Sequence, residues 1–431
     1  MSYPSGELSL YLQLEAQLLE VRAAHNDEEN PLEDGVLEQM DDAWWKMTQE
    51  DRDFLNKAKR VLITSGPVYG RLDDNKLVGN RIRGIWTTHF AEYLLKKGFL
   101  VTLLVADTHT KLVGQVLGKA RGLLNVITHT GYHDYAAKCY QAAKTHHAAV
   151  LGAAVVNWIP AEPIKGKMPT EGFKEGDIIN IPFMLAPRVI NRMRTINPQL
   201  TLIGCKMLIG STPEELLDAA YHVLLTAKCN VILANDMAGG LREKKLVYPD
   251  HSVVTHDNDF EALYADLLAV IDDVHYQSVF QGDSIRGVVE YLSQFDNTVG
   301  QYRDRFVKPV AGKDMVFGAV AVRVPGTGWL CSPREKGEAF TAMDAALVRR
   351  VKGTEIHLVG DSRKATLNAP LLIRFGEMHN AEVVVHLHEQ IEGAPTLPYA
   401  PPGTVRDNDR ELPDGEPIVN IEGHGCLIKV N

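Results

Sequence analysis

The sequence lacks the features that mark a secreted or membrane-spanning protein. It has only five cysteines, at positions 139, 205, 229, 331 and 426, and no two of them form a Cys-x-x-Cys pair. An odd number of scattered cysteines argues against a disulfide framework and fits reduced thiols. No apolar stretch approaches the roughly 18 residues of a transmembrane helix, and the first residues show no basic region followed by an apolar run. We therefore expect a cytoplasmic protein without a signal peptide or a membrane partner.

A surplus of positive charge is also missing. Lysine and arginine number 45 against 55 aspartates and glutamates, which gives a formal net charge of -10. Nucleic-acid binding relies on clustered basic residues that contact phosphates, so we expect no nucleic-acid partner. A small anion held in a local basic pocket stays possible. The 431 residues, of which 45% are hydrophobic, predict roughly three folded units at ~150 residues each.

Four segments with different patterns follow one another along the chain. Residues 1–58 carry leucines and tryptophans at helical spacing, which predicts a helical segment used for packing or assembly. Residues 59–272 alternate short buried strands with helices, as in a doubly wound, mostly parallel, Rossmann-like sheet. Residues 273–308 look helical and polar, and we expect a connector there. Residues 309–431 contain short alternating runs, which predict a C-terminal α/β domain with a largely antiparallel sheet.

The second segment opens with one strand–helix–strand unit. We expect a buried strand at 61–66, a helix at 86–97 closed by Gly98, and a second strand at 100–105. Further strands are expected at 148–156, 200–203 and 230–233, with helices at 135–145, 187–196 and 213–227. In the C-terminal segment, strands are expected at 316–324, 355–359, 382–388 and 418–421.

The long loop after the first strand is the natural ligand site, because open α/β sheets bind ligands beyond the carboxyl ends of their strands. Glycines there permit close backbone approach, and a helix start offers N–H groups to anions. Basic side chains add phosphate contacts. We expect a phosphate-bearing ligand; the alternative is a solvated loop with incidental basic residues. The glycines and basic residues are Gly66, Gly70, Gly79, Gly84, Arg71, Lys76, Arg81 and Arg83.

Residues 60–270 resemble the phosphopantothenate–cysteine ligase family through motifs that occur in the family's order. The family strand ending T-x-G-G-T, followed by E-P-[LI]-D-P-V-R-x-I-x-N-x-S-S-G, resembles ITSG at 63–66 and RLDDNKLVGNRIRG at 71–84. The family's A-A-V-A-D-[YF] resembles AAVVNW at 153–158, and K-I-K-K resembles IKGK at 164–167. Its G-F-A-A-E-T resembles GCKM at 204–207, and K-x-x-D-x-I-V-A-N-D resembles KCNVILAND at 228–236.

The resemblance implies a ligase in which CTP or ATP, with Mg²⁺, activates a phosphorylated carboxylate as an acyl-nucleotidyl intermediate that an amine then attacks. Both substrates would be small molecules, and the family usually forms homodimers. By motif position, Asn80 polarises the acyl carbonyl, Lys165 and Lys167 neutralise the departing pyrophosphate, and Arg81 and Arg83 contact the substrate phosphate. The nucleotide-binding positions implied are Gly66, Asp73, Gly84, Ala153, Ala154, Lys228, Asn235 and Asp236.

Several positions depart from the family pattern. Ile82 and Arg83 stand where the family has two serines that hold the substrate phosphate, and Asn157 replaces an aspartate. Cys205 and Lys206 stand near the positions of a missing phenylalanine and glutamate. These changes put the acyl substrate in doubt, while the nucleotide region looks retained.

The C-terminal segment contains a His-x-His pair, His386 and His388, on an expected strand, so alternation points both rings to one face. With His424 they could hold Zn²⁺ or a similar metal; surface or core histidines are the alternative. Residues 305–431 resemble the class II aldolase/adducin family, whose metal-binding histidines correspond to these three. The family's catalytic glutamate position is Asn368, which cannot serve as a carboxylate base, and its phosphate-binding positions are Ala319 and Ala321.

Three functions stay open on the sequence. The first is a nucleotide-dependent ligase with an accessory metal-binding domain. The second is a metal-dependent, class II aldolase-like lyase, and the third is a non-catalytic assembly protein built from degenerate enzyme domains. The retained Asn80 and Lys165 favour the first, whereas Asn157, Ala319 and Asn368 favour the third.

Overall fold

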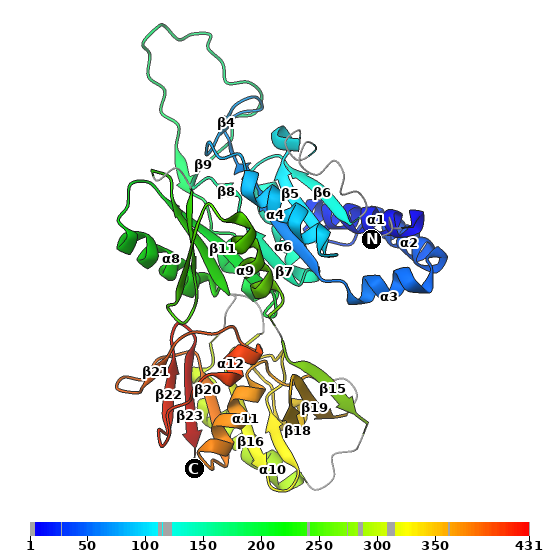
Figure 1. Ribbon diagram of the computed structural model, residues 1–431, viewed down its shortest axis with the longest axis vertical. Coiled ribbons are helices and arrows are strands. Elements are labelled where there is room, and N and C mark those ends of the chain that lie inside the picture. Colours follow the sequence, from blue (N-terminus) through cyan, green and yellow to red (C-terminus); the bar gives the residue numbers. More distant parts are fainter. Residues whose placement is uncertain are drawn as a thin grey trace. The chain divides into compact units, whose positions relative to one another are not determined.

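The computed structural model describes two compact units, each with its own sheet (Figure 1). The described residues are 5–26, 28–110, 114, 123–238, 242–273, 275–282, 288–307, 315–360 and 363–430. Unit 1 comprises Met1–Ala220, Val231–Leu246 and Thr255–Ile271; unit 2 comprises Tyr221–Asn230, Val247–Val254 and Asp272–Asn431. Among the described helices, none combines the length and apolar character that a membrane span requires.

Unit 1 is built on an eight-stranded sheet in the order β14-β13-β12-β11-β7-β1-β5-β6. The strands from β12 to β6 in this order pair in parallel, which confirms the predicted doubly wound, mostly parallel fold. Apolar runs such as Val61–Ile63 are fully buried because helices cover both faces of the sheet. The bounds are β1 (Arg60–Ser65), β5 (Leu100–Ala106), β6 (Leu124–His129), β7 (Ala148–Leu151), β11 (Thr201–Leu208), β12 (Val231–Asp236), β13 (Glu243–Val247) and β14 (Val253–Asp257).

The helices of unit 1 lie on opposite faces of this sheet. Helix α4 packs against α9, where the Tyr264 hydroxyl donates to the Trp86 carbonyl at 3.1 Å. Helix α6 packs against α7. Because crossover connections are right-handed, the reversal of direction after β6 puts α6 on the face opposite α4. The bounds are α4 (Ile85–Lys96), α6 (Tyr132–Thr145), α7 (Ile190–Ile196), α8 (Pro213–Ala227) and α9 (Phe260–Ile271).

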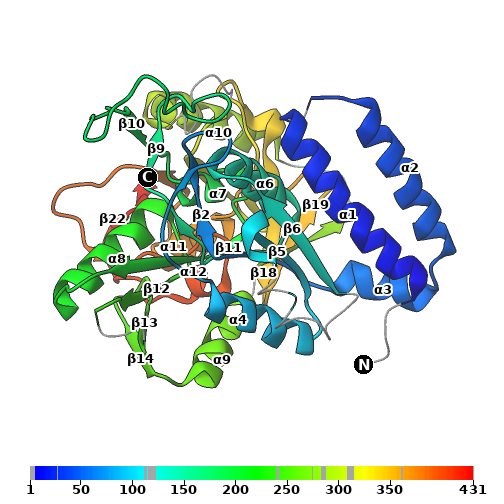
Figure 2. The same ribbon diagram turned by 90° about the horizontal axis from the view of Figure 1, so that it is seen from above.

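Three helices precede the sheet: α1 (Gly6–His25), α2 (Pro31–Lys46) and α3 (Gln49–Lys57). Each starts at a side-chain cap, formed by Ser5, Asn30 and Thr48 in turn. Helices α1 and α2 lie side by side (Figure 2). Helix α1 also packs on α6 and β6, and Asn125 Nδ2 donates to the Leu12 carbonyl at 2.8 Å. The segment therefore covers one side of the unit 1 fold.

Short strand pairs stand beyond the carboxyl edge of the unit 1 sheet. Strand β2 (Pro67–Val68) pairs with β8 (Ala154–Val155), β3 (Gly70–Arg71) with β4 (Leu77–Val78), and β9 (Trp158–Pro160) with β10 (Phe183–Leu185). The segment between β9 and β10 extends away from the sheet in Figure 1. We call residues 158–185 the arm.

Unit 2 is built on a nine-stranded, mostly antiparallel sheet in the order β15-β19-β18-β17-β16-β20-β23-β22-β21, which confirms the second predicted fold. Helix α11 packs against β16, β20 and β23, and α10 covers β16 through a separate core cluster. The bounds are β15 (Gln277–Gln281), α10 (Val289–Tyr302), β16 (Ala319–Val324), β17 (Gly328–Cys331), β18 (Ala346–Lys352), β19 (Glu355–Val359), α11 (Ala369–Met378), β20 (Val383–Leu387), β21 (Thr396–Leu397), α12 (Val405–Asp409), β22 (Ile418–Ile421) and β23 (Gly425–Val430).

The segment expected to be a helical connector, residues 273–308, is partly different in the structure. It contains helix α10 but also strand β15, which pairs in parallel with β19 at the edge of the unit 2 sheet. Polar residues at both ends of β15 prevent its recognition as a strand from the sequence. An edge strand tolerates such residues because one of its sides faces solvent.

Candidate active site

The loops that follow β1 and β7 meet at the point where the unit 1 sheet changes direction. From β1 the chain proceeds to β5 and β6 on one side, then returns to β7 and continues through β11 and β12 on the other. Loops leaving the sheet at such a point diverge and leave a crevice beyond the carboxyl ends of the strands, where ligands of this fold class bind. The predicted residues Gly66, Ala153 and Ala154 follow these two strands.

Two predicted glycines lie at this carboxyl edge, Gly66 after β1 and Gly84 before α4. Gly66 has φ 77° and Gly84, which precedes α4, has φ 72°, both in the region that favours glycine. The backbone carbonyl of Gly84 accepts hydrogen bonds from the hydroxyls of Ser65, Thr87 and Thr88, at 2.9, 2.8 and 2.9 Å. Among the described residues, no side chain caps the N–H groups at the start of α4. This helix start is therefore held in place and offers N–H donors to an anion.

Asn80 lies against the second loop of the crevice. Its Nδ2 donates to the carbonyls of Ala154 and Val155, at 3.2 and 3.0 Å. Ala154 N–H donates to the Gly66 carbonyl at 2.9 Å, and Ala153 N–H donates to Thr64 Oγ1 at 3.1 Å. The structure thus brings together Asn80, Gly66 and the two alanines, which are far apart in sequence. The amide oxygen of Asn80 has no hydrogen-bond donor within the described residues.

The lysine loop, residues 164–168, is tied to the turn at residues 72–76. Asp73 is buried and accepts from the Met168 N–H at 2.9 Å, while its Oδ2 lies 2.8 Å from Lys76 Nζ. Asp74 accepts from the Gly166 N–H at 2.8 Å. The Lys76 ammonium, with three backbone N–H donors, holds the pKa of Asp73 well below its ordinary value. Asp73 is therefore ionised, and it positions the loop rather than binding a ligand itself.

Lys165 and Lys167 are exposed on this tied loop, and Arg81 and Arg83 are exposed just before α4. None of these four cations has a hydrogen-bond or ion-pair partner in the described part of the chain. Because loops 72–76 and 164–168 are hydrogen-bonded together, the lysines belong to the same side of the sheet as the glycines and Asn80. The local excess of positive charge favours an anionic ligand.

Asn235 and Asp236, the predicted pair at the end of β12, have two different roles. Asp236 accepts from the backbone N–H groups of Ser211, Gly210 and Ala238, at 2.9, 3.0 and 2.7 Å, and these bonds lower its pKa. Asp236 therefore shapes the loop after β11. Asn235 is half-buried, and its side chain has no hydrogen-bond partner among the described residues, so it remains available to a ligand.

Lys228 is the predicted residue that the structure does not bring to this edge. It follows α8 with φ 55° and precedes β12, so it lies at the amino end of that strand. The crevice lies at the carboxyl ends of the same parallel strands. The motif match placed Lys228 with the nucleotide because sequence spacing alone does not show which end of a strand a residue occupies.

Two histidines at the carboxyl edge were not anticipated. His129 ends β6 and is 1% exposed, and neither ring nitrogen has a hydrogen-bond partner among the described residues. Burial lowers the pKa of His129 to about 4, so the ring is neutral near neutral pH. The His109 ring lies against Gly66, where a Cβ would be 3.7 Å from it. The only sequence signal was their position after apolar strands.

Comparison with known proteins agrees with this arrangement. Residues 56–261 match the family model for the DNA/pantothenate metabolism flavoprotein C-terminal domain. This segment is similar to that family. The coenzyme A biosynthesis bifunctional protein CoaBC of Thermococcus kodakarensis is 27% identical over 192 residues, which are 44% of this chain and 45% of the relative. The chain thus spans about half the length of that curated relative.

Two solved structures with low identity are also similar to part of the chain. The DNA/pantothenate metabolism flavoprotein from Streptococcus pneumoniae is 18% identical and covers 49% of this chain and 99% of its own, with a TM-score of 0.40. A Cab2 variant in complex with phosphopantothenate-cysteine is 18% identical and covers 52% of this chain and 89% of its own, with a TM-score of 0.43. The predicted resemblance to the phosphopantothenate–cysteine ligase family is confirmed for the flavoprotein C-terminal domain. The aldolase-like resemblance of residues 305–431 stays a prediction.

Outside the flavoprotein C-terminal domain, unit 2 brings its three predicted histidines together. One ring nitrogen each from His386, His388 and His424 lies within 4.8 Å of the other two. His386 is on β20, His388 follows that strand, and His424 lies in the turn before β23. This close approach depends on Gly425, where a Cβ would lie 1.9 Å from the Leu387 carbonyl oxygen.

The three-histidine cluster has unsatisfied nitrogens that point to a ligand. His386 Nδ1 donates to the Cys426 carbonyl at 2.9 Å, which leaves Nε2 with a free lone pair. His386 Nε2 and His424 Nδ1 are buried, and neither has a hydrogen-bond partner among the described residues. Burial lowers the pKa of His386 to about 4 and that of His388 to about 2, so both are neutral. Neutral, converging imidazoles are the donor set that a transition metal requires.

Proposed function

We propose that the flavoprotein C-terminal domain is the catalytic part of a nucleotide-dependent ligase that joins a phosphorylated carboxylate to an amine. The observation that carries the proposal is the cluster of Gly66, Gly84, Asn80 and Ala154 at the switch point of the sheet. Four exposed cations lie on the connected loops and have no partner among the described residues. Carboxylate activation by a nucleoside triphosphate needs such positive charge, because a charged pyrophosphate leaves. The family match supports the reaction class.

Each group has a task in this reaction. The uncapped N–H groups at the start of α4 bind an anionic group beside Gly66, where the His109 ring forms the neighbouring wall. The Nδ2 of Asn80 is committed to the carbonyls of residues 154 and 155, which leaves its Oδ1 to accept a hydrogen bond from an N–H or O–H group of the bound substrates. Lys165 and Lys167 neutralise the leaving pyrophosphate, and Asn235 binds the nucleotide. Bound Mg²⁺ would be held chiefly by the phosphates of CTP or ATP.

The substrates are proposed from the family and from the local charge. A related Cab2 structure holds phosphopantothenate-cysteine, so phosphopantothenate and cysteine are the first pair to test. Arg83 stands at the position of a family serine, Arg81 lies two residues before it, and both are exposed. A guanidinium can bind a phosphate through two parallel hydrogen bonds. We therefore propose that these arginines hold the phosphate of the acyl substrate.

The test is a pyrophosphate-release assay on the full chain with phosphopantothenate, cysteine, Mg²⁺ and either CTP or ATP. We expect release that requires both the carboxylate and the nucleotide. Asn80→Ala should lower the rate by on the order of 100-fold, as for the loss of one oriented polar group at the reacting centre. Asn75→Ala is a matched control, because that side chain lies in the neighbouring turn and makes no hydrogen bond within the described residues.

Nucleotide binding is measured in parallel by the shift of the thermal unfolding midpoint. Wild type and Asn75→Ala should be stabilised by CTP or ATP at millimolar concentration through linkage. No stabilisation by either nucleotide would contradict the ligase proposal. Binding without pyrophosphate release for any carboxylate–amine pair would instead support the non-catalytic alternative.

A second proposal concerns unit 2: the three-histidine cluster binds a divalent metal such as Zn²⁺. The buried nitrogens of His386 and His424, which lack partners among the described residues, fit a metal, because unpaired buried polar atoms are otherwise costly. A bound metal would supply Lewis acidity at an open fourth position. This observation keeps the lyase alternative in consideration for unit 2.

We also propose a cytoplasmic homodimer. All five cysteines are free thiols, as expected in a reducing compartment. The arm carries exposed apolar side chains, and Trp158, Ile178 and Leu185 are 56%, 87% and 63% exposed. We propose that a second copy of the chain covers these apolar side chains, because proteins of the family usually dimerise. Light scattering should give twice the chain mass, and Ile178→Asp with Leu185→Asp should give monomers; a wild-type monomer would contradict the proposal.

A further inference from the structure

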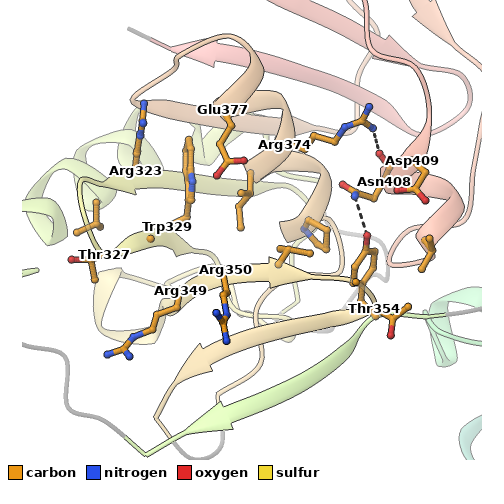
Figure 3. A pocket seen from close by; sticks show the side chains of 18 of the residues that line it. Arg323, Thr327, Trp329, Arg349, Arg350, Thr354, Arg374, Glu377, Asn408 and Asp409 are labelled. Carbon is orange, nitrogen blue, oxygen red and sulfur yellow. Dashed lines mark hydrogen bonds between the residues drawn. The ribbon is translucent and has the colours of Figure 1, made fainter.

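Unit 2 contains a cavity of about 800 Å³ that is separate from the three-histidine cluster. It is lined by Arg323 of β16, Trp329 of β17, Arg349 and Arg350 of β18, and one side of α11 (Figure 3). The α11 residues on this wall recur at helical spacing: Pro370, Ile373, Arg374 and Glu377. The volume lies in the range of pockets that bind small molecules.

A β-bulge allows two consecutive arginines to line the same cavity. Residues next to each other in a regular strand point to opposite faces of the sheet. The register of β18 against β19 shifts between Val348 and Arg350, and both Arg349 and Arg350 then line the cavity. Bulges of this kind redirect side chains and are frequent beside functional sites. The strand irregularity therefore concentrates positive charge at one place.

Close contacts fix the walls. A Cβ on Gly376 would lie 2.3 Å from the Trp329 ring, so only glycine lets the indole pack against α11. A Cβ on Gly328 would lie 2.1 Å from the Val348 carbonyl oxygen, beside the bulge. On the α12 side, Asn408 Nδ2 donates to the Tyr276 hydroxyl at 2.9 Å. The cavity is thus bounded by packed elements on three sides.

The charge of the cavity is unbalanced. Four arginines line it, against two carboxylates, Glu377 and Asp409. Arg374 donates to the Arg410 carbonyl at 2.7 Å, and Arg323 donates to Asn380 Oδ1 at 2.9 Å, so both are partly committed to the protein. Arg350 has no hydrogen-bond or ion-pair partner within the described residues. An uncommitted guanidinium beside a second arginine is a site for an anion.

We propose that this cavity binds the phosphoryl group of a small phosphorylated molecule. A single guanidinium can satisfy both oxygens of a carboxylate through two parallel bonds. A phosphoryl group has three oxygens and accepts from two guanidiniums at once, which matches the adjacent Arg349 and Arg350. The apolar wall at Trp329 and Ile373 leaves room for the rest of the molecule. The site belongs to unit 2 and does not depend on the ligase activity.

The test uses inorganic pyrophosphate as the probe and hydrogen–deuterium exchange of the full chain as a local readout. Pyrophosphate should slow exchange in peptides covering residues 323–331 and 346–354. The double variant Arg349→Ala, Arg350→Ala should weaken this protection by at least about tenfold. Lys352→Ala removes one exposed positive charge from the same strand outside the cavity and should keep it.

Two additional measurements distinguish this site from the unit 1 crevice and from nonspecific anion binding. Asn80→Ala, which disables the proposed ligase site in unit 1, should keep the protection in unit 2. Malonate at the same concentration should protect these peptides less than pyrophosphate does. The proposal is overturned if millimolar pyrophosphate gives no protection, if Lys352→Ala or Asn80→Ala loses it as the arginine variant does, or if malonate protects equally. Unchanged thermal unfolding of the arginine variant without ligand confirms that the fold is intact.

Discussion

Gly84 approaches Gly66 so closely that a Cβ on Gly84 would lie 2.2 Å from the Gly66 nitrogen. This contact joins the end of β1 to the start of α4. The pair therefore links the stability of unit 1 with its proposed nucleotide site.

Gly84→Ala is expected to lower both stability and nucleotide binding. A φ of 72° costs an alanine about 1–2 kcal/mol, and the clash with Gly66 adds to that cost. Gly176→Ala is the matched control, because Gly176 also has a positive φ, of 90°, but nothing within 4 Å of its Cβ position. Urea unfolding should show a larger loss for Gly84→Ala. Equal losses would mean that the Gly66 contact contributes nothing.

Asp73→Asn is expected to weaken nucleotide binding without touching the nucleotide. The substitution removes the charge that holds Lys76 and weakens the hydrogen bond from Met168, so the lysine loop is less well ordered. We expect nucleotide affinity to fall on the order of tenfold, measured by calorimetric titration. Glu162→Gln changes an exposed carboxylate near the same loop and should leave the affinity unchanged. An unaltered affinity in Asp73→Asn would show that this tether is not needed.

His129 is expected to make unit 1 sensitive to acid. Burial lowers its pKa from 6.5 to about 4, so between these values the unfolded chain binds a proton that the folded protein excludes. The stability it contributes is present above about pH 6.5 and is lost as the pH falls toward about 4, by up to about 3 kcal/mol. His129→Leu should flatten this acid limb of the unfolding free energy, measured in urea at several pH values. The exposed His133→Leu should not, and an unchanged slope in His129→Leu would contradict the prediction.

Removing one histidine of the three-histidine cluster is expected to abolish tight metal binding. His386→Ala leaves two ligands, and Zn²⁺ affinity should fall on the order of 100-fold or more. Metal content is measured by mass spectrometry on purified protein, and affinity by competition with a chelating dye. His357→Ala removes another buried histidine of the same sheet that lies outside the cluster. Equal metal content in His386→Ala and wild type would show that the cluster is not the site.

Much of the unit 1 fold was predictable because its signals are local. The buried run Val61–Ile63 followed by Gly66, and the helix closed at Gly98, mark β1, α4 and β5 directly. Strand β11 runs to Leu208, beyond its predicted end at 203, because its last residues are only half-buried and lack an apolar run. Such strand ends are defined by pairing with β12, which the sequence does not show.

The candidate site was only partly predictable. Motif order placed Asn80 and Ala154 together, and the structure joins them by a hydrogen bond. Asp73 and Asp236 were expected to bind the nucleotide. In the structure both instead accept hydrogen bonds from backbone N–H groups in tight turns. The cavity of unit 2 that arginines line was not predicted from the sequence, because Arg323 and Arg350 come together only through strand order and a bulge. Residues that meet through long-range pairing leave no spacing signal.

The parallel pairing of β15 with β19 has a consequence for biosynthesis. Gln277 pairs with Glu355, so the edge strand emerges from the ribosome well before its partner exists. Until Val359 has been made, β15 has no neighbour, and unpaired strands in nascent chains are prone to bind other chains. Closing so long a loop is also slow. Unit 2 thus completes its sheet late in translation, and a pause between residues 282 and 355 would prolong the interval in which β15 is unpaired.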